Sequence, residues 1–465
     1  MLKKYENKLV RGKKYIKTLT VFAAAVFTFN VAVAVESQAE NLKDALATTY
    51  IKNPTLNAQR ARLRSTDEGV SIARSGFRPK ITGNASYTYQ ESRGTTTSKT
   101  ETKAYSVSLT QPVFRGFRTI NTLRQAEAEV LAGREDLRTT EQDIFLQTVT
   151  AYMDVVRDQA IVRLRQNNVK VLTKQLRATN DRFQVGEVTK TDVAQSTARQ
   201  SGAVSQLSLA KANLASSRAV YQRLVGNIPG HLRSPNGLRK YIPKNMRVAL
   251  EIGDAEHPAI LAAGYREQSA KHAVKTILGE LLPEVNFDAG YSDSRTGSLV
   301  SETSTLTARA SMPIYQGGSI SARVRQAKQT RVQRMQQVKE ASIRIKAEII
   351  ASWGQWEASK AALISNRSQV EASKTALNGV REEEKVGQRT VLDVLDAEQE
   401  YLDAQVALST TKRDYIVAGY SVLSSIGRLG AADLNLSVPL YDATRYYDKV
   451  KGKWFGFGKS RISKR

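Results

Sequence analysis

The sequence contains no cysteine among its 465 residues and only three histidines, His231, His257 and His272. Without thiols the chain has no disulfide, no thiolate metal site and no cysteine nucleophile. Such a chain suits an oxidising compartment, because it has no stray thiol to be oxidised. The sequence also lacks a Ser/His/Asp arrangement, an HExxH motif and a cluster of metal ligands. We therefore expect no enzyme activity, no catalytic residue, no metal and no cofactor.

The first 39 residues follow the order of a secretory signal peptide. "MLKKYENKLVRGKKYIK" is basic, "TLTVFAAAVFTFNVAVAV" is apolar, and small residues follow at Ser37 and Ala39. Cleavage after Ala39 is favoured, and cleavage after Ala34 is the alternative. An uncleaved membrane anchor stays open, because an apolar run of 18 residues just reaches the length of a span. Alanines and threonines dilute that run, so we expect a mature chain outside the cytoplasm.

Acidic residues are few compared with basic ones, 44 against 70, which gives a formal net charge of +26. The signal peptide carries +5 of this charge, and +21 remains on the mature chain. Strongly basic chains often bind nucleic acid. An exported protein seldom meets nucleic acid, however, and the basic residues are spread along this chain. We expect no nucleic-acid partner, and we attribute the charge to solvated helix faces and to contact with anionic lipid headgroups.

The chain is two copies of one unit. Pro54/Pro258 and Tyr87/Tyr291 match at an offset of 204, and from "QPVFRGF" (111–117) and "MPIYQGG" (312–318) onward the offset is 201. A single three-residue length difference accounts for the change. The expected domains are a signal peptide at 1–39, a first repeat at 40–226, an inter-repeat linker at 227–250, a second repeat at 251–430 and a C-terminal tail at 431–465.

Each repeat is expected to contain the same elements in the same order. A helix of about thirty residues comes first, from Leu42 to about Ser75 and from about Ala255 to Leu278. Two strands with period-two alternation follow. Their shared-face residues are Ile81, Gly83, Ala85, Tyr87 and Tyr89, then Tyr105, Val107 and Leu109; and, in the second repeat, Val285, Phe287, Ala289 and Tyr291, then Leu306, Ala308, Ala310 and Met312.

A long proline-free stretch ends each repeat, at about 117–184 and 318–385, and would extend about 100 Å as one helix. After a Val-Gly turn, a helix of about 37 residues returns to Gly226 or Gly427. The second returning helix has a coiled-coil seam with alternating steps of three and four. Its apolar members are Leu392, Leu395, Leu402, Val406, Ile416, Tyr420 and Leu423. This length predicts an elongated, oligomeric protein.

Four strands per chain cannot enclose anything, and their edges would be open to aggregation. One face of each strand is apolar or small, with tyrosines near the ends, as in outer-membrane strands. Only closed sheets span lipid, because every backbone group needs a partner there. Several chains must then share one barrel, and three chains would supply twelve strands. The alternative is a small soluble β-layer that caps a coiled coil.

Six stretches carry a family resemblance: "ENLKDAL", "NPTL", "SVSLTQPVF", "RFQVGEVTKTDV", "SMPIYQGG" and "VGQRTVLDVLDAEQEYLDAQ". The last two are the most specific. Across essentially the whole mature chain, the sequence resembles the TolC family of outer-membrane channel-tunnels. The resemblance implies a mainly α fold with a membrane β-barrel: a homotrimer with a twelve-stranded barrel in the cell outer membrane and a twelve-helix coiled-coil tunnel in the periplasm, with two structural repeats per chain.

The resemblance also implies a function and partners. The chain would be an outer-membrane exit duct for multidrug efflux, type I protein secretion or both. It would be opened at its periplasmic end by docking to an inner-membrane pump and a periplasmic adaptor (membrane fusion) protein, and it would contact outer-membrane lipid. The alternative is a periplasmic adaptor or coiled-coil structural protein. An adaptor would have one hairpin flanked by lipoyl-like and barrel segments, which does not fit a full-length duplication.

Paired acids follow the second Val-Gly turn. Asp192 and Asp393 each end a T-x-x-D sequence, the pattern of a helix capping box. Asp396 lies beyond the first helical turn, and Gln195 takes its place in the first repeat. The resemblance implies that Asp393 and Asp396 line the periplasmic gate constriction. Six crowded carboxylates in a trimer would attract cations, so we hypothesise an electronegative constriction.

The resemblance further implies a gate latch in which Arg389 ties the inner helical hairpin to the outer one through Thr191 and Asp192. Glu384 stands where a family example has tyrosine, and it would repel Asp192 unless a neighbouring lysine intervenes. We expect Glu384 to be part of this latch region.

The two Val-Gly turns are expected at the helical tips. Glycine commonly follows the last residue of a helix, so these turns have a sufficient structural explanation. The resemblance adds that the tips contact the adaptor; the residues concerned are Val185, Gly186, Val386 and Gly387. The basic, aromatic C-terminal tail has no role that the sequence assigns.

Overall fold

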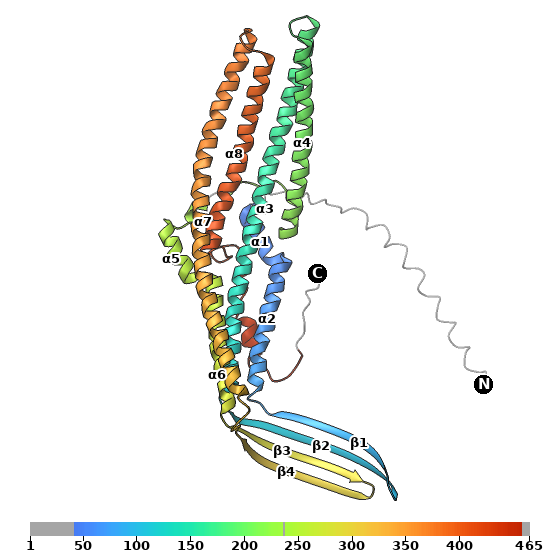
Figure 1. The fold of residues 1–465 in the computed structure, drawn as a ribbon. Coiled ribbons are helices and arrows are strands. Elements are labelled where there is room, and N and C mark those ends of the chain that lie inside the picture. The colour runs from blue at the N-terminus through green and yellow to red at the C-terminus, as the bar shows by residue number, and fades with distance from the viewer. Residues whose placement is uncertain (1–40, 236–237, 458–465) are drawn as a thin grey trace, which may run out of the picture. The chain divides into compact units, whose positions relative to one another are not determined.

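The computed structural model describes residues 41–235 and 238–457 (Figure 1). The described residues form one compact unit, and the expected signal peptide lies outside them. The first repeat contains α1 (Leu42–Lys52), α2 (Pro54–Ser75), β1 (Lys80–Arg93), β2 (Thr97–Arg115), α3 (Arg118–Gln184) and α4 (Lys190–Val225). The second contains α5 (Met246–Glu256), α6 (Pro258–Leu278), β3 (Glu284–Thr296), β4 (Leu299–Ser311), α7 (Ser319–Lys385) and α8 (Val391–Ser425). Short helices are η1 (Leu238–Lys240), η2 (Gly279–Leu281) and α9 (Arg445–Val450).

The first helix of each repeat is in fact two helices, so the prediction of one continuous helix is wrong. The chain becomes extended at Asn53 (φ −61°, ψ 124°) and at His257 (φ −65°, ψ 123°), and a proline follows each. The proline ring disfavours helical geometry at the residue before it. In the second repeat the helical segment also begins earlier than expected, at Met246 instead of about Ala255, because the side chain of Asn245 caps it.

The long helices are confirmed. α3 and α7 each contain 67 residues, which corresponds to about 100 Å. α4 returns along α3, and α8 returns along α7 (Figure 1). Most of the predicted seam on α8 is buried, whereas Leu392 in its first turn remains 37 % exposed. Among the described residues, no helix has an apolar stretch long enough to cross a membrane.

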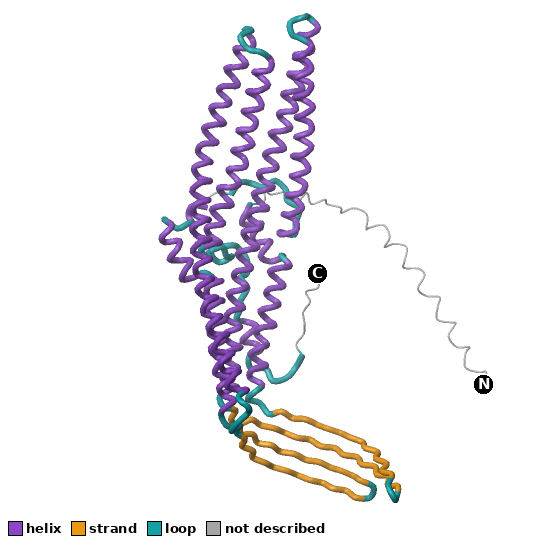
Figure 2. The backbone as a smooth tube through the Cα atoms, viewed as in Figure 1, coloured by secondary structure: helices purple, strands orange, loops and turns teal. Residues whose placement is uncertain are grey.

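The four strands form one antiparallel sheet in the order β1-β2-β3-β4 (Figure 2). The two hairpins, one from each repeat, meet where β2 pairs with β3. A bulge between Pro112 and Phe114 shifts the register of β2, at a position where proline cannot donate a ladder hydrogen bond. The predicted strands are therefore confirmed, and they join the two repeats into one layer.

The main hydrophobic core lies where the shorter helices and the inter-repeat segment pack on the long helices. Phe145, Tyr152 and Tyr221 are among its largest fully buried side chains. The ring of Tyr50 on α1 lies 6.2 Å from that of Phe145 on α3, edge to face. The side-chain amide of Asn53 donates to the Leu224 carbonyl of α4 at 3.0 Å. These contacts hold the short helices of the first repeat against its long hairpin.

Candidate functional site

The register of the sheet gathers the apolar residues of all four strands on one face. Ile81, Leu109, Ala289 and Leu306 lie in one cross-strand row. The adjacent row on the opposite face contains Thr82, Ser108, Gly290 and Thr305. Ile81 is 67 % exposed and Leu306 is 71 % exposed, so the apolar face is not covered within the described chain. The sheet has one apolar face and one polar face, and both are open.

The apolar residues form a band that runs obliquely across the strands. Toward the hairpin turns the band ends at Tyr89 in β1, Tyr105 in β2 and Tyr291 in β3. Followed through the strand pairing, Tyr105 lies opposite position 85 of β1, and Tyr291 lies level with position 83. From β1 to β3 the boundary therefore moves from position 89 to 85 to 83, away from the hairpin turns. An apolar band of constant height crosses tilted strands in this way, and membrane strands are tilted. Tyrosines at its boundary match the aromatic girdle of such sheets.

Both outer strands of the sheet have one unused hydrogen-bonding edge. β1 pairs with β2 on one side and β4 pairs with β3 on one side; neither has a second partner strand in the described part of the chain. Every residue of β1 and β4 is exposed. Long exposed edges are templates for pairing with another chain.

The junction between the sheet and the helices depends on two glycines in close contact. A Cβ on Gly116 would lie 2.1 Å from the carbonyl oxygen of Gly279, and a Cβ on Gly279 would lie 2.2 Å from that of Gly116. Gly116 also has φ +56°, which favours glycine. Arg115 pairs with Glu284 at 3.2 Å, and Arg118 pairs with the same carboxylate. The glycine contact and these ion pairs therefore fix the first residues of α3 against the start of β3.

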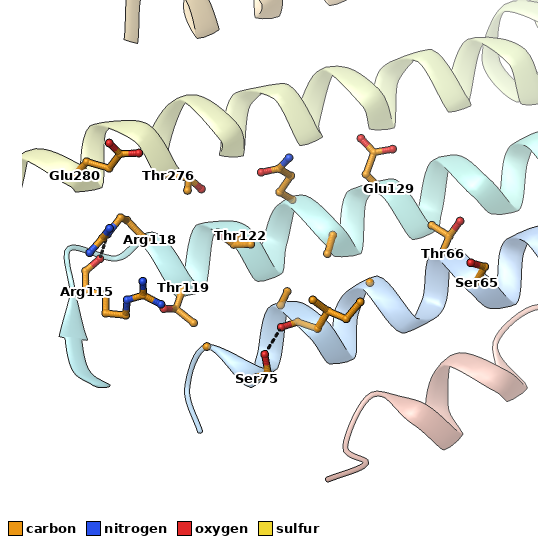
Figure 3. A pocket seen from close by; sticks show the side chains of 16 residues that line it. Ser65, Thr66, Ser75, Arg115, Arg118, Thr119, Thr122, Glu129, Thr276 and Glu280 are labelled. Carbon is orange, nitrogen blue, oxygen red and sulfur yellow. Dashed lines mark hydrogen bonds between the residues drawn. The ribbon is translucent and has the colours of Figure 1, made fainter. Parts of the chain in front are cut away.

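A groove of about 760 Å³ lies beside this junction, between α2, α3 and α6 (Figure 3). Arg115 and Arg118 lie at its sheet end, and Ser65 and Thr66 lie at the other end. Much of the remaining lining is small, including Gly69, Ala73, Gly76 and Ala126. In residues 41–235 and 238–457, no group of three or more His, Cys, Asp or Glu side chains is placed to hold a metal ion.

At the far ends of the hairpins, both predicted capping boxes are confirmed. The Thr189 hydroxyl accepts from the Asp192 N–H at 3.2 Å, and Asp192 accepts from the Thr189 N–H at 2.8 Å. Thr390 and Asp393 repeat this arrangement at 3.2 and 2.9 Å. Hydrogen bonds from the Thr189 hydroxyl and N–H lower the pKa of Asp192. The Thr390 N–H and hydroxyl lower the pKa of Asp393. Both acids are held ionised by the local cap.

Asp396, which capping does not explain, has a partner on the other hairpin. Arg199 of α4 donates to its carboxylate at 2.5 Å. The Asp396 side chain is 57 % exposed and that of Arg199 is 42 % exposed. Arg199 has no signal in the sequence that identifies it, because no local spacing relates a residue of α4 to one of α8.

The proposed latch residues make other contacts within one chain. Arg389 donates to Glu383 at 2.8 Å, beside its own turn, and not to Thr191 or Asp192. Glu384 accepts from Arg182 of α3 at 2.5 Å. Arg182, and not a lysine, thus offsets the charge of Glu384. The predicted link from Arg389 to Thr191 and Asp192 stays a prediction.

The Val-Gly turns lie at the helical tips, as expected. Gly186 and Gly387 have φ of 82° and 79°, which closes each helix with glycine in the left-handed region. Val185 and Val386 are 71 % and 72 % exposed. Each hairpin therefore presents one apolar side chain at its end.

Most of both repeats matches a known family. The family model described as outer membrane efflux protein matches residues 45–227 and 253–428. The chain is 38 % identical over 442 residues to the outer membrane efflux protein BepC of Brucella suis biovar 1, covering 94 % of this chain and 96 % of that protein. It is 26 % identical over 418 residues to the outer membrane protein TolC of Salmonella enteritidis, covering 86 % and 84 %.

Two further similarities concern secretion and fold. The alkaline protease secretion protein AprF of Pseudomonas aeruginosa is 24 % identical over 341 residues, covering 71 % of this chain and 70 % of that protein. Among solved structures, the Campylobacter jejuni CmeC outer membrane channel superposes with a TM-score of 0.74 at 17 % identity, covering 89 % of each chain. At that identity the similarity concerns the fold.

Proposed function

This chain belongs to the outer membrane efflux protein family, and from that premise we propose that three copies form an exit duct for efflux. The TolC-like family and fold predicted from the sequence are confirmed, and the protein is located in the outer membrane with its helical tunnel in the periplasm. In the proposed mechanism an inner-membrane pump and a periplasmic adaptor dock onto the helical tips and open them. The duct acts by conduction, without catalysis or a cofactor.

The observation that carries this proposal is the sheet with an exposed apolar face, a polar face and two open edges. β4 of one copy placed beside β1 of the next satisfies both edges. Three copies then give twelve strands, an even number within the range of outer-membrane barrels. The apolar face, with Ile81 and Leu306, would contact lipid, and the polar face, with Thr82 and Thr305, would line a water-filled duct.

The gate is proposed at the opposite end, at the hairpin tips. Asp393 and Asp396 of three copies would form the constriction, with Arg199 offsetting part of its charge. Arg182 and Glu384 hold the two hairpins of one chain together, and we propose that Arg389 reaches Thr191 and Asp192 of a neighbouring copy. Exposed ion pairs contribute about 0–1 kcal/mol each, so docking at the tips would supply enough free energy to separate them.

Type I protein secretion is the second proposed function, because the similarity to AprF covers most of this chain. The duct required for a drug and for an unfolded protein is the same, and the pump selects the cargo. Deleting each candidate pump gene, then measuring drug sensitivity and secreted protein, distinguishes the two functions. A periplasmic adaptor, the alternative from the sequence, would not carry an outer-membrane sheet.

Matched substitutions on adjacent residues of β4 test the proposal. Leu306→Lys places a charge on the apolar face, where lysine at the membrane midplane costs about 2–4 kcal/mol. Thr307→Lys places the same charge on the polar face. We expect Leu306→Lys to abolish the outer-membrane trimer, and Thr307→Lys to leave the trimer intact and change single-channel conductance. Normal trimers and conductance for Leu306→Lys would contradict a lipid-facing sheet.

A further inference from the structure

The C-terminal segment folds back along the first repeat. α9 packs beside α2, as Figure 1 shows. The Tyr446 hydroxyl donates to Glu68 at 2.7 Å, and the Ser71 hydroxyl donates to the Val450 carbonyl at 2.7 Å. Val450 is 3 % exposed. These contacts direct the chain after α9 along α2 toward the sheet.

Arg78 fixes where this segment ends relative to the sheet. It donates to the Lys453 carbonyl at 2.8 Å, and its guanidinium lies 4.7 Å from the centroid of the Trp454 ring. Arg78 precedes the first residue of β1, Lys80, by two positions. Trp454 is therefore held beside the connection between α2 and β1, where the helices give way to the sheet.

Three aromatic side chains at this level are exposed. Trp454 is 59 % exposed, Phe455 is 85 % exposed and Phe457 is fully exposed. These three rings within four residues form an apolar patch that the described chain covers only in part, by Arg78 over Trp454. Other exposed aromatics lie near the same end of the sheet: Phe77, Phe117 and Tyr315. Aromatic residues gather in this way at the boundary of the hydrocarbon region of a membrane.

Basic residues accompany the patch. Lys451 and Lys453 flank the glycine before Trp454, and Lys451 is paired with Asp448 at 2.7 Å. The chain offers no acidic side chain between Lys449 and Phe457. Aromatic rings beside Lys453, for which the described residues provide no acidic partner, are complementary to a surface with an apolar interior and anionic headgroups.

We propose that Trp454, Phe455 and Phe457 insert into the periplasmic leaflet of the outer membrane, with Lys453 against anionic phospholipid headgroups. The inference rests on the proposed placement of the sheet in the membrane, because the patch lies at the start of β1, where that placement puts the periplasmic boundary. The C-terminal segment then anchors α2 to the membrane surface. Tryptophan and lysine suit this position, since their apolar parts reach the acyl chains while their polar ends stay hydrated.

Tryptophan fluorescence of the full-length trimer in vesicles tests the insertion. The vesicles contain phosphatidylethanolamine and phosphatidylglycerol, with and without lipids brominated near the headgroup. Trp454→Phe is the matched control, because it keeps an aromatic ring and leaves Trp353 and Trp356 as the only tryptophans. The emission of Trp454 is the fluorescence of the wild type minus that of Trp454→Phe. We expect brominated lipid to quench this difference and to leave the fluorescence of Trp454→Phe unchanged. Phe455→Ser/Phe457→Ser should reduce that quenching.

A charge-reversal pair tests the headgroup contact. Lys453→Glu should weaken the quenching in vesicles with phosphatidylglycerol and have a smaller effect in vesicles of phosphatidylcholine alone. Lys449→Glu on α9 makes the same charge change farther from the patch and should match wild type. Equal quenching for Lys453→Glu and wild type in both vesicle types would overturn the anionic headgroup contact.

Conductance recorded in the same vesicles separates this inference from the proposed function. Normal channels with a Trp454 signal that is insensitive to brominated lipid would overturn membrane insertion alone. Protection of Trp454 from aqueous acrylamide without quenching by brominated lipid would assign the patch to a protein contact and would also overturn it. Absence of any channel would instead count against the proposed function.

Discussion

Arg199 on α4 and Asp396 on α8 form an ion pair at 2.5 Å between residues 197 positions apart in the sequence. Through this pair the first helical hairpin contacts the second near their tips. The pair is substantially exposed, so it stabilises the contact by no more than about 1 kcal/mol. Its larger effect is on charge, because Arg199 offsets the negative charge of Asp396. The corresponding residue of the first repeat, Gln195, is neutral.

Removing either member of this pair should change ion selectivity in opposite directions. Arg199→Ala leaves Asp396 uncompensated, so we expect stronger cation selectivity and block by lower concentrations of divalent cations. Asp396→Ala removes the acid, and both properties should weaken. Single-channel recording in bilayers with KCl and added Mg²⁺ measures both.

Arg344→Ala is the control for this pair, because it removes an exposed arginine that pairs with Glu348 within α7, away from the tips. Its selectivity should match wild type. If Arg199→Ala and Asp396→Ala shift selectivity in the same direction, or not at all, the electronegative constriction is wrong.

The pair formed by Arg182 and Glu384 should contribute to keeping the gate closed. Arg182→Ala and Glu384→Gln each remove one link per chain, so the closed trimer should lose up to about 3 kcal/mol in total. We expect larger resting conductance and increased entry of large antibiotics into cells. In a double-mutant cycle the combined variant should differ little from either single variant; fully additive effects would show that the two side chains act independently.

The buried carboxyl of Asp67 on α2 should make stability depend on pH. Its side chain is fully buried, neither oxygen has a hydrogen-bond partner among the described residues, and burial raises its pKa to about 6. The folded chain therefore holds this proton more tightly than the unfolded chain. The contribution of Asp67 to stability is fully present below about pH 4 and is lost as pH rises through about 6.

Asp67→Asn should accordingly raise Tm by a few degrees at pH 7.5, and the gain should shrink below pH 5. Thermal unfolding of the detergent-solubilised protein measures this difference. Glu129→Gln, which neutralises an exposed acid on α3, should not reproduce the pattern. A gain that is the same at every pH would exclude titration of Asp67 as its cause.

His257 should have the opposite dependence. Burial, then the positive charges of Arg344 and Arg138, lower its pKa to about 4, and its Nδ1 accepts from the Ala259 N–H at 3.1 Å. As pH falls, the unfolded chain protonates His257 at a higher pH than the folded chain does. The contribution of neutral His257 to stability is therefore fully present above about pH 6.5 and is lost as pH falls toward 4. At 1.36 kcal/mol per pKa unit the loss is on the order of 3 kcal/mol per chain.

His257→Asn should keep the helix cap, because Asn53 caps the corresponding helix of the first repeat, and it should remove this acid sensitivity. His231→Asn makes the same change at an exposed position, and this variant should retain the acid sensitivity of the wild type. Identical curves of Tm against pH for wild type and His257→Asn would contradict the assignment.

Local patterns predicted most of the fold. The lengths of α3 and α7, the strand faces and the capping boxes at Thr189 and Thr390 depend on spacing within one segment, which a single sequence contains. The breaks before Pro54 and Pro258 were predictable too, because proline restricts the preceding residue. The continuous helical composition on both sides obscured them.

The ion pairs of the tips could not be predicted in the same way. Arg182 and Glu384 are 202 residues apart, and nothing in their local sequences relates them. Their contact follows from how two separate hairpins pack side by side. The path of the C-terminal segment is similar, since Trp454 and Arg78 are in contact although the whole second repeat lies between them in the sequence. Long-range pairing of this kind depends on tertiary packing, which residue spacing does not encode.

The equal length of α3 and α7 constrains how the protein can evolve or be engineered. If both helices start at one sheet and their tips must meet one docking partner, the two helices must have the same length. Deleting two turns from one helix alone would leave its tip about 11 Å short of the other. Viable changes in tunnel depth must therefore occur in both gene halves together, and chimaeras should exchange whole hairpins of equal length.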